Sequence, residues 1–366
     1  MTASVEQRFM ERCLDLARRG AGKVNPNPMV GCVIVRNGKI VGEGFHEKFG
    51  GPHAEISALN HAGKNSKGSA LFVSLEPCVH YGKTPPCTDA IIHAGISQVF
   101  IASKDPNPLV CGKGIRQLRM AGIRVKVGLL QKEAELLNEK FFKCMKSGLP
   151  YVGIKLAQTL DGRIADAAGK SKWISSGAAR KIVHRLRNEY DAVMVGANTV
   201  RRDNPELTVR LVSGKNPVRV VVDGRLSLPT SRKIFKTSVA PTWILTSAKA
   251  VKANIRKVQK FVSQGVHVLP VSSAYSMNPG SILRILAAEG ISSVLIEGGT
   301  DTVEGFVNRY LADKLYLFVA PKILGSGLNG FCFQTLRTLN KSIKLLMIKV
   351  SLVGDDILVE AKFHQP

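Results

Sequence analysis

The sequence lacks the features of a membrane-bound or exported protein. None of its apolar runs approaches the roughly 18 consecutive residues that a membrane-spanning helix needs. The segment Met1-Thr2-Ala3-Ser4-Val5-Glu6-Gln7 has no basic stretch followed by an apolar core, so it does not resemble a signal peptide. We therefore expect a cytoplasmic protein with no membrane partner.

Acidic and aromatic residues are also scarce. The 27 Asp and Glu residues stand against 52 Lys and Arg, which gives a formal net charge of +25 at pH 7. A basic surface can bind nucleic acid through its phosphates, but an aromatic content of 6% is too low to suggest base-stacking platforms. No known nucleic-acid-binding motif is present. We expect no nucleic-acid partner, and favour a solvated basic surface with pockets for a phosphorylated small molecule.

The seven cysteines do not suggest a disulfide framework, because their number is odd. Thiols stay reduced in the cytoplasm. The cysteines outside the motif described next are therefore expected to be free thiols: Cys13, Cys32, Cys111, Cys144 and Cys332.

A cluster of metal-binding residue types is present in the first third of the chain. His53-Ala54-Glu55 is followed by Glu76-Pro77-Cys78 and then by Cys87. One His, two Cys and a Glu that is not a ligand form the zinc site of hydrolases that deaminate a ring. Three protein ligands leave a zinc position open for water, and the Glu can carry a proton from that water to the departing amine. The pattern predicts zinc ligation by His53, Cys78 and Cys87, and proton transfer by Glu55.

The local sequence places these residues at the starts of secondary-structure elements. Pro52 can open a helix, with His53 in its first turn. A single buried Cys is often an ordinary apolar side chain, but the combination of residues favours zinc chemistry. The spacing departs from the generic Cys-x-x-Cys of deaminases, because eight residues, Val79 to Pro86, intervene.

The first part of the chain has the alternation of an α/β domain. Apolar spacing predicts an amphipathic helix over residues 5–19, and strands and helices then alternate through residue 102. A further helix is expected over residues 131–146, before the linker-like Ser147-Gly148-Leu149-Pro150. We predict a three-layer α/β domain over residues 1–147.

The pattern restarts after the linker and predicts a second three-layer α/β domain over residues 150–366. It includes a helix over residues 177–189 and a strand over 293–296 that runs into Gly298-Gly299-Thr300. Glycines at a helix start let backbone N–H groups approach a phosphate, although such a pair is also common in an ordinary turn. Residues 225–280 are the hardest to assign.

Several motifs, taken in order over nearly the whole chain, resemble the bifunctional riboflavin-pathway deaminase–reductase family. They are Asn25-Pro26-Asn27-Pro28, His53-Ala54-Glu55, Glu76-Pro77-Cys78, Gly82-Lys83-Thr84-Pro85-Pro86-Cys87, Asp105-Pro106-Asn107-Pro108, Leu160-Asp161-Gly162-Arg163 and Ala320-Pro321-Lys322-Ile323-Leu324-Gly325. The long spacing between the two cysteines is that of the family. The resemblance implies a cytidine-deaminase-like N-terminal domain and a C-terminal domain similar to dihydrofolate reductase.

The resemblance also implies two reactions, with zinc and NADPH as cofactors. The first removes the 2-amino group of 2,5-diamino-6-ribosylamino-4(3H)-pyrimidinone 5′-phosphate. The second reduces the ribosyl group to ribityl with NADPH and gives 5-amino-6-ribitylaminouracil 5′-phosphate. By motif position, zinc falls to His53, Cys78 and Cys87, and proton transfer to Glu55. A homo-oligomer, dimer or tetramer, is also expected.

The remaining matched positions form three groups. The deaminase substrate positions are Asn27, His46, Lys83, Asp105 and Asn107. The NADPH positions are Ala157, Trp173, Thr199, Asp203, Gly299, Thr300, Asp301, Thr302, Val303, Glu304 and Gly305. The reductase substrate positions are Lys155, Ser171, Arg187, Leu207, Arg210 and Glu297.

Physical arguments support some of these roles. Lys83 is a flexible cation between the two cysteines and suits a substrate phosphate, whereas His80 in the same segment is a rival zinc ligand that the family match argues against. Arg187 and Arg210 are the candidates for a phosphate-binding fork, although Arg187 on its helix is as readily part of a solvated surface pair. Lys155 and Glu297 are expected to bracket the sugar.

Two other functions compete with this one. An RNA-editing deaminase shares the His-x-Glu and Pro-Cys motifs and suits the charge of +25, but it explains neither the cysteine spacing nor the second half of the chain. A zinc-stabilised binding module needs a closed site with four protein ligands, and only three are placed here.

Overall fold

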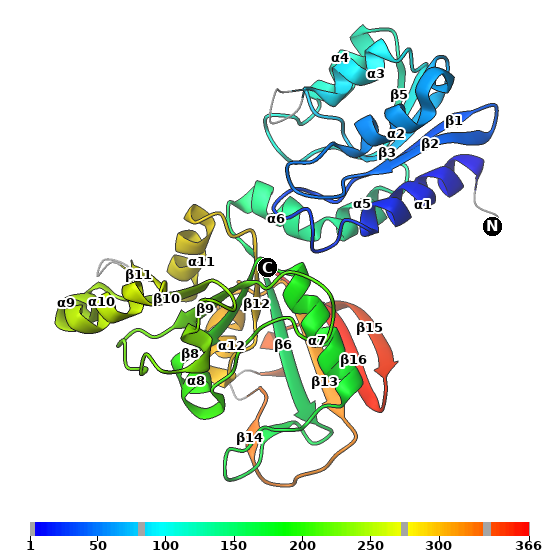
Figure 1. The fold of residues 1–366 in the computed structure, drawn as a ribbon. Helices are drawn as coiled ribbons and strands as arrows, with labels where there is room; N and C mark the ends of the chain where they lie inside the picture. The colour runs from blue at the N-terminus through cyan, green and yellow to red at the C-terminus, as the bar shows by residue number, and fades with distance from the viewer. Residues whose placement is uncertain (1–3, 80–84, 272–276, 332–337, 366) are drawn as a thin grey trace. The chain divides into compact units, whose positions relative to one another are not determined.

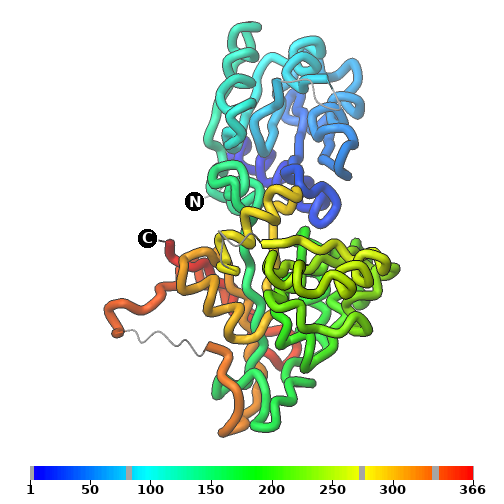
Figure 2. The backbone as a smooth tube through the Cα atoms, turned by 90° about the vertical axis from the view of Figure 1, so that its left-hand side faces the viewer, coloured from blue at the N-terminus to red at the C-terminus, as the bar shows by residue number. Residues whose placement is uncertain are grey.

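The computed structural model divides into two compact units, Met1–Gly148 (unit 1) and Leu149–Pro366 (unit 2), which are described separately. The structure describes residues 4–79, 85–271, 277–331 and 338–365. Within these ranges no helix is long and apolar enough to cross a membrane. Figures 1 and 2 follow the chain through each unit in two views.

Unit 1 is built around a five-stranded sheet with the strand order β2-β1-β3-β4-β5. β1 pairs antiparallel with β2 and β3, whereas β3, β4 and β5 are parallel. The strands are β1 (Gly31–Arg36), β2 (Lys39–Phe45), β3 (Ala70–Leu75), β4 (Gln98–Ser103) and β5 (Arg124–Val127). Asn37 and Gly38, both at positive φ, form the turn between β1 and β2, as an Asn-Gly pair predicts.

Helices cover both faces of this sheet, so unit 1 has the predicted three layers. They are α1 (Val5–Arg18), α2 (Ala54–Ala62), the short 3₁₀ helix η1 (Gly63–Ser66), α3 (Cys87–His93), α4 (Lys113–Met120), α5 (Gln131–Leu137) and α6 (Glu139–Ser147). Met10 of α1 packs in one cluster with Val33, and Ala58 of α2 packs in another with Ile34. Successive side chains of a strand point to opposite faces, so β1 is buried from both sides.

Two expected boundaries in unit 1 were wrong. α2 begins at Ala54, and His53 is its N-cap rather than a residue of its first turn. The single helix expected over residues 131–146 is two helices that meet at Asn138. The Asn138 amide accepts a hydrogen bond from Met29 N and donates one to Met29 O, both at 2.8 Å. Its backbone leaves helical geometry (φ −106°, ψ 24°), because a contact with a distant segment overrides the local preference.

Unit 2 contains a nine-stranded sheet with the order β11-β10-β9-β8-β12-β6-β13-β16-β15. The strands β11, β10, β9, β8, β12, β6 and β13 are parallel to one another. At the other edge, β16 pairs antiparallel with β13, and β15 pairs antiparallel with β16. The strands are β6 (Tyr151–Thr159), β8 (Ala192–Gly196), β9 (Val218–Val222), β10 (Thr242–Ser247), β11 (His267–Val271), β12 (Ser293–Ile296), β13 (Lys314–Ala320), β15 (Leu345–Val353) and β16 (Asp356–Phe363). A small second sheet pairs β7 (Arg163–Ala165) with β14 (Leu328–Asn329).

Helices cover both faces of the large sheet, which confirms the predicted three-layer α/β class for unit 2. They are α7 (Gly177–Glu189), α8 (Ala197–Asp203), η2 (Lys233–Phe235), α9 (Ala248–Ala253), α10 (Ile255–Ser263), α11 (Pro279–Ala288), α12 (Thr300–Val307) and η3 (Leu339–Lys341). Val183 of α7 packs with Leu295, whereas Leu283 of α11 and Phe306 of α12 pack with Val294. β12 is thus apolar on both faces, as is typical of a buried parallel strand.

Candidate active sites

The three predicted zinc ligands lie together in unit 1. His53 is the N-cap of α2, Cys78 follows β3, and Cys87 is the first residue of α3. Their candidate ligand atoms all lie within 4.8 Å of one another. His53 Nδ1 is 3.2 Å from Cys87 Sγ and 3.5 Å from Cys78 Sγ. Among the residues that the structure describes, this is the one cluster of His, Cys and acidic side chains with such geometry.

The chemistry of these donors fits zinc. The hydrogen bond from the Cys87 thiol, supported by His53, holds the pKa of Cys78 well below its usual value, which favours the thiolate form that binds a metal. Zinc binds thiolate and imidazole, and a catalytic zinc site uses three protein ligands. These three residues therefore make a donor set of the catalytic kind.

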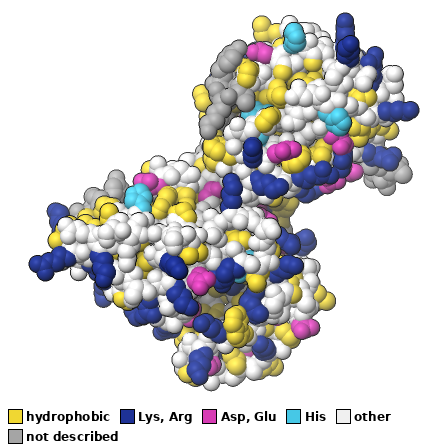
Figure 3. Space-filling model, in the orientation of Figure 1, with side chains coloured by type: hydrophobic (Ala, Val, Ile, Leu, Met, Phe, Trp, Pro, Cys, Tyr) yellow, Lys and Arg dark blue, Asp and Glu magenta, His cyan; other side chains and the backbone are white. Residues whose placement is uncertain are grey.

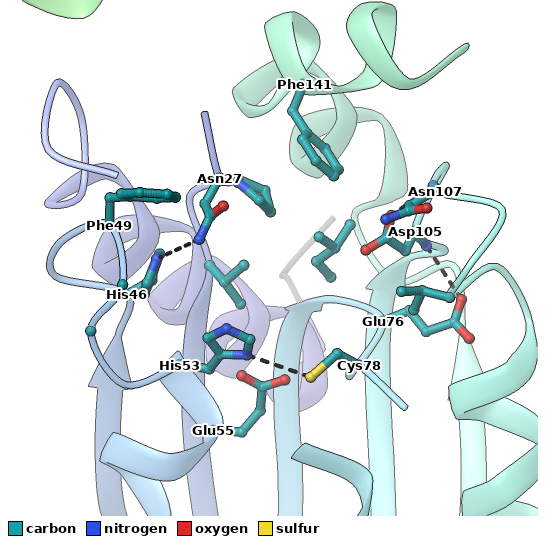
Figure 4. Close-up of a pocket in the computed structure, with 16 residues that line it drawn as sticks. Asn27, His46, Phe49, His53, Glu55, Glu76, Cys78, Asp105, Asn107 and Phe141 are labelled. Carbon is teal, nitrogen blue, oxygen red and sulfur yellow. Dashed lines mark hydrogen bonds between the residues drawn. The ribbon is translucent and has the colours of Figure 1, made fainter. Parts of the chain in front are cut away.

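Glu55 lies beside the ligands, in the first turn of α2. Its side chain is buried, and this burial raises the pKa of Glu55 to about 7 although the neighbouring His53 opposes the shift. A carboxyl group with such a pKa can accept and release a proton near neutral pH. Figure 4 shows the carboxylate next to His53 and Cys78 at the floor of a pocket.

This pocket is a cavity of about 290 Å³, and four predicted substrate positions line it from two sides. On one side, Asn27 Nδ2 donates to His46 Nε2 at 3.2 Å, and His46 Nδ1 donates to the Pro52 carbonyl at 3.0 Å. Burial lowers the pKa of His46, which favours this neutral form. On the other side, Asp105 Oδ1 accepts the backbone N–H of Asn107 at 2.8 Å. The structure thus brings these positions together around Glu55 (Figure 4).

Two aromatic side chains that the sequence analysis missed also line this cavity. Phe49 comes from the loop after β2, and Phe141 comes from α6 and points into the pocket opposite Glu55 (Figure 4). No local pattern marks Phe141, because the fold brings α6 to a pocket whose other lining residues precede Phe141 by 31 or more positions. Lys83 and its rival His80 lie outside the described residues, as does Cys332.

A buried ion pair occupies the predicted substrate region of unit 2. Arg187 of α7 donates through Nε and Nη2 to Glu297 Oε1 and Oε2, at 2.6 and 2.9 Å. The side chains are only 11% and 6% exposed. Burial opposes the charge of Glu297, but Arg187 outweighs it and holds the pKa of Glu297 below its usual value, with help from Lys155 on β6. Burial lowers the pKa of Lys155 itself.

The guanidinium of Arg187 also makes a third hydrogen bond, through its remaining nitrogen. Its Nη1 donates to the Thr208 carbonyl at 3.0 Å, in the segment before Arg210. Arg187 is therefore not one of the solvated surface cations considered from the sequence, because all three nitrogens bond within the unit. It fixes Glu297 and the Thr208 segment relative to each other.

The segment with Arg210 is also held by His184, which the sequence analysis missed. His184 Nδ1 accepts the backbone N–H of Arg210 at 2.8 Å and that of Leu211 at 3.4 Å. Burial, followed by the charges of Arg187 and Arg210, lowers the pKa of His184 to about 4. The Arg210 side chain is half exposed and bonds to Glu206. A neutral histidine thus supports the backbone of a solvent-accessible cation.

A second cavity, of about 540 Å³, collects part of the predicted NADPH set. Its lining includes Thr199 of α8 and a group from the start and one side of α12: Gly299, Asp301, Thr302 and Gly305. Gly299 N donates to Thr199 Oγ1 at 3.2 Å. Val303 on the same helix is instead fully buried in the core. The N–H groups at a helix start favour an anion, so this cavity suits a phosphate-bearing cofactor.

A third cavity, of about 610 Å³, is lined by Ser171 and Asp203 among others, and Ser171 Oγ donates to Asp203 Oδ1 at 3.3 Å. Three other predicted positions differ in environment. Ala157 lies on β6. Trp173 is exposed, and the Arg180 guanidinium lies 4.4 Å from its ring centroid. Leu207 is buried in the core and has a φ of +52°. Only the backbone of Leu207 is therefore suited to contact a substrate.

One glycine pattern escaped the sequence analysis. Residues Gly325 to Gly330 read Gly-x-Gly-x-x-Gly, which resembles a dinucleotide-binding fingerprint when it joins a strand to a helix. Here the run contains β14, which pairs with β7, and Arg163 donates to the Gly325 carbonyl. The pattern is thus part of the small two-stranded sheet and does not join a strand to a helix as a phosphate loop does.

On the face drawn in Figure 3, the basic residues of both units are dispersed and do not gather in one patch. Lys and Arg side chains outnumber acidic ones on this face and are interspersed with polar and apolar side chains. The excess of 52 Lys and Arg over 27 Asp and Glu is thus visible on both units. A dispersed charge of this kind affects solubility and the approach of anions more than it defines a site.

Comparison with known proteins finds a matching protein family for each unit. The cytidine and deoxycytidylate deaminase zinc-binding region matches residues 3–103, and the RibD C-terminal domain matches residues 150–359. The riboflavin biosynthesis protein RibD of Aquifex aeolicus is 44% identical over 360 residues, which cover 98% of this chain and 99% of that protein. RibD of Bacillus amyloliquefaciens is 43% identical over 363 residues, covering 98% and 96%.

Solved structures agree over the full length. RibD of Acinetobacter baumannii superposes with a TM-score of 0.89 at 36% identity, covering 99% of both chains. A diaminohydroxyphosphoribosylaminopyrimidine deaminase/5-amino-6-(5-phosphoribosylamino)uracil reductase from Thermotoga maritima gives 0.85 at 40% identity, covering 98% of this chain and 99% of that one. The chain therefore belongs to the RibD family of riboflavin biosynthesis, in which a zinc deaminase domain precedes an NADPH-using reductase domain.

Proposed function

We propose that unit 1 hydrolyses the 2-amino group of 2,5-diamino-6-ribosylamino-4(3H)-pyrimidinone 5′-phosphate. The observation that carries this proposal is the cluster of His53, Cys78 and Cys87 beside the buried Glu55, at the floor of a pocket. The related Thermotoga maritima protein is named as a deaminase of such a pyrimidine. In the reaction the ring carbon loses its amine as ammonia and gains the oxygen of water.

In this proposal, different residues of unit 1 bind the metal and transfer the proton. His53, Cys78 and Cys87 would hold zinc, which in such sites lowers the pKa of a bound water to roughly 7. Glu55 takes a proton on its carboxylate and returns it to the nitrogen that leaves, since a pKa of about 7 suits both transfers.

The pocket walls would orient the pyrimidine above Glu55. Asn27 and His46 on one side, and Asp105 and Asn107 on the other, offer the polar groups that match a ring bearing amino and carbonyl substituents. We propose that Lys83, in the segment between the two cysteine ligands, binds the phosphate through its positive charge. This assignment follows from its place in the sequence alone.

Unit 2 would reduce the ribosyl group of the deaminated product to ribityl with NADPH. We assign NADPH to the predicted set Ala157, Trp173, Thr199, Asp203 and Gly299 to Gly305, with its phosphates near the start of α12. Val303 would contribute to the fold of that helix rather than a side-chain contact. Trp173, exposed beside Arg180, offers an aromatic face to the cofactor.

The reductase substrate would lie between Lys155, Glu297 and Arg210. Lys155 and Glu297 can polarise the ribose ring oxygen and move a proton as hydride reaches C1′. Arg210, whose guanidinium is accessible, is the stronger candidate for the phosphate. Arg187 acts through its bonds to Glu297 and Thr208, while Ser171 and the backbone at Leu207 complete the substrate set.

Two further properties belong to this proposal. The enzyme would be cytoplasmic, because Cys78 and Cys87 bind a metal only as reduced thiols and the cytoplasm keeps thiols reduced. It would form a homo-oligomer through β15, the edge strand of the large sheet, where Leu346, Ile348, Val350 and Leu352 are exposed. An uncovered apolar edge strand is a template for pairing with another chain.

A single experiment tests the two activities. The protein is incubated with the diaminopyrimidine phosphate, with and without NADPH. The absorbance of the pyrimidine and of NADPH and the amount of ammonia released are followed. We expect ammonia release in both cases and NADPH oxidation only after deamination. A Cys78→Ser variant should lose zinc and ammonia release but still oxidise NADPH on the deaminated substrate. Full zinc in this variant would contradict the ligand assignment.

A further inference from the structure

Glu76 belongs to the conspicuous Glu76-Pro77-Cys78 motif, yet the chemistry described above does not use it. The residue follows β3 and reaches the wall of the deaminase pocket. Its side chain is only 3% exposed, and among the described residues no Lys or Arg forms an ion pair with it. A buried carboxylate needs compensating hydrogen bonds, so the partners of Glu76 define its role.

Both oxygens of Glu76 are satisfied by backbone N–H groups from one later segment. Oε1 accepts from Gly114 N at 3.0 Å and from Ile115 N at 3.2 Å. Oε2 accepts from Gly112 N at 3.0 Å and from Asp105 N at 3.3 Å. Four donors thus converge on a single carboxylate, 29 to 39 positions away in the sequence.

Three of these donors belong to the start of α4. The first N–H groups of a helix lack intrahelical acceptors, and a negative charge is favourable there. The N-cap residue Gly112 has no side chain that could serve, and the first turn of α4 contains no acidic residue. The Glu76 carboxylate therefore caps α4 from outside the helix.

The fourth donor gives this cap a functional consequence. Asp105 begins the loop whose side chains Asp105 and Asn107 line the pocket, and Glu76 binds both ends of that loop through Asp105 and Gly112. Glu76 is also two residues before the ligand Cys78. A Cβ placed on Gly114 would lie 2.3 Å from the Pro77 carbonyl, so α4 packs directly against the peptide that leads to Cys78.

We propose that Glu76 is a positioning residue for deamination, which sets the Asp105–Asn107 wall of the pocket relative to the Cys78 arm of the metal site. The proposal rests on the deaminase function of unit 1. It differs from a purely structural cap, because the loop it holds carries substrate-binding side chains. Loss of the carboxylate should therefore weaken substrate binding while the metal site and the unit remain intact.

The test is a Glu76→Gln variant of the full chain, which keeps the shape but places an NH₂ group among four N–H donors. We expect the KM for the diaminopyrimidine phosphate to rise roughly tenfold, since unsatisfied buried donors change equilibria by factors of this order. The kcat should stay within a few-fold, with one zinc per chain. Reduction of the deaminated intermediate by unit 2 should be unchanged in the same sample.

Glu43→Gln is the matched control. Glu43 is a second carboxylate of unit 1; it is only partly buried and pairs with Arg12 at 2.7 and 2.8 Å, away from the pocket lining. Its loss should lower thermal stability without changing the KM. If Glu76→Gln behaves like this control, with lower stability and an unchanged KM, the residue is only structural and the proposal fails. Zinc loss in Glu76→Gln would overturn it as well.

Gly114→Ala tests the same contact if Glu76→Gln does not fold. The added methyl group would lie 2.3 Å from the Pro77 carbonyl and 3.3 Å from Glu76 Cγ and Oε1, so it must move the start of α4 away from both residues while the charge of Glu76 is kept. We expect the same increase in KM with zinc retained, and an unchanged KM would contradict the proposal. Absence of ammonia release by the wild-type chain would instead contradict the deaminase function itself, so the two failures are distinguishable.

Discussion

At the residue scale, burial is the factor that adapts ordinary side chains to chemistry in this protein. It raises the pKa of Glu55 to about 7 and lowers that of His184 to about 4. The two shifts have the same origin, because removal from water disfavours the charged form of either group. Glu55 thereby becomes able to exchange a proton near neutral pH, whereas His184 stays neutral and keeps Nδ1 as an acceptor.

The role of Glu55 predicts a specific defect. Glu55→Gln preserves the size of the side chain but removes its ability to carry a proton. Loss of a general acid–base group should lower the deamination rate by at least ~10²-fold, while zinc remains bound because Glu55 is not a ligand. Ammonia release and metal content measured on the same sample check this. A near wild-type rate would mean that another residue carries the proton.

His184 predicts a pH dependence of the stability of unit 2. Its folded-state pKa of about 4 lies below the ordinary value of about 6.5. The unfolded chain therefore binds the proton more readily, and stability present above pH 6.5 is lost as the pH falls towards 4. The loss from this residue is at most about 3 kcal/mol.

The measurement compares the wild-type chain with His184→Asn, whose amide oxygen can accept in place of Nδ1 but does not titrate. Both tryptophans, Trp173 and Trp243, lie in unit 2, so denaturant unfolding followed by tryptophan fluorescence reports on this unit within the full chain. We expect the wild type to lose stability relative to His184→Asn between pH 6.5 and 4. Parallel pH curves would rule out His184 as the source.

At the element scale, α6 shows how a segment outside the zinc-binding motifs completes the deaminase pocket. It lies beyond residues 3–103, which match the deaminase zinc-binding region. Phe141 points from it into the pocket, while the adjacent Phe142 is buried outside the pocket lining. One turn of helix thus has a binding side and a packing side, as Figure 4 indicates for Phe141.

This division predicts opposite effects for two neighbouring substitutions. Phe141→Ala should raise the KM for the pyrimidine roughly tenfold, because stacking of a base on an aromatic ring contributes about 1–3 kcal/mol, with little change in stability. Phe142→Ala should instead cost about 3–5 kcal/mol of stability. Kinetics and thermal unfolding of both variants separate the effects. An unchanged KM in Phe141→Ala would exclude its contact with substrate.

The proposed homo-oligomer forms through the edge strand β15, and substitutions on this strand test it. Replacing the exposed Val350 and Leu352 by Lys should favour the monomer, since charged side chains on an edge strand block pairing with another chain. Sedimentation of the wild-type protein and the double variant at equal concentrations checks this. An unchanged sedimentation coefficient would mean that another surface forms the assembly, or that the protein is a monomer.

The sequence predicted these elements well where the apolar spacing is regular and local. The helix over residues 177–189 follows from a short-range pattern and is confirmed, and Asn37-Gly38 forms the turn that an Asn-Gly pair favours. The break at Asn138 could not be predicted, because its cause is a contact with Met29, 109 positions away. The pairing of Arg187 with Glu297, 110 positions apart, was missed for the same reason.

At the scale of the whole molecule, each unit contains its own core and its own candidate site. The clusters of unit 1 lie within residues 9–137, and the deaminase pocket is lined by residues 27–141. The cores and cavities of unit 2 begin after residue 148. A domain with its own core can fold independently, so the two activities need not depend on each other.

The last prediction is that the two activities can be separated by cutting the chain at Gly148. Residues 1–148 expressed alone should bind one zinc and release ammonia from the diaminopyrimidine phosphate, because α6, which ends at Ser147, and its Phe141 are retained. The same fragment with Phe141→Ala is the matched control: it keeps the zinc ligands and α6 but lacks the aromatic wall of the pocket, so it should bind zinc with a raised KM. Ammonia release, zinc content and KM are measured for both fragments beside the full chain. An inactive but folded 1–148 fragment would mean that unit 2 completes the deaminase site, and the assignment of the whole pocket to unit 1 would then be wrong.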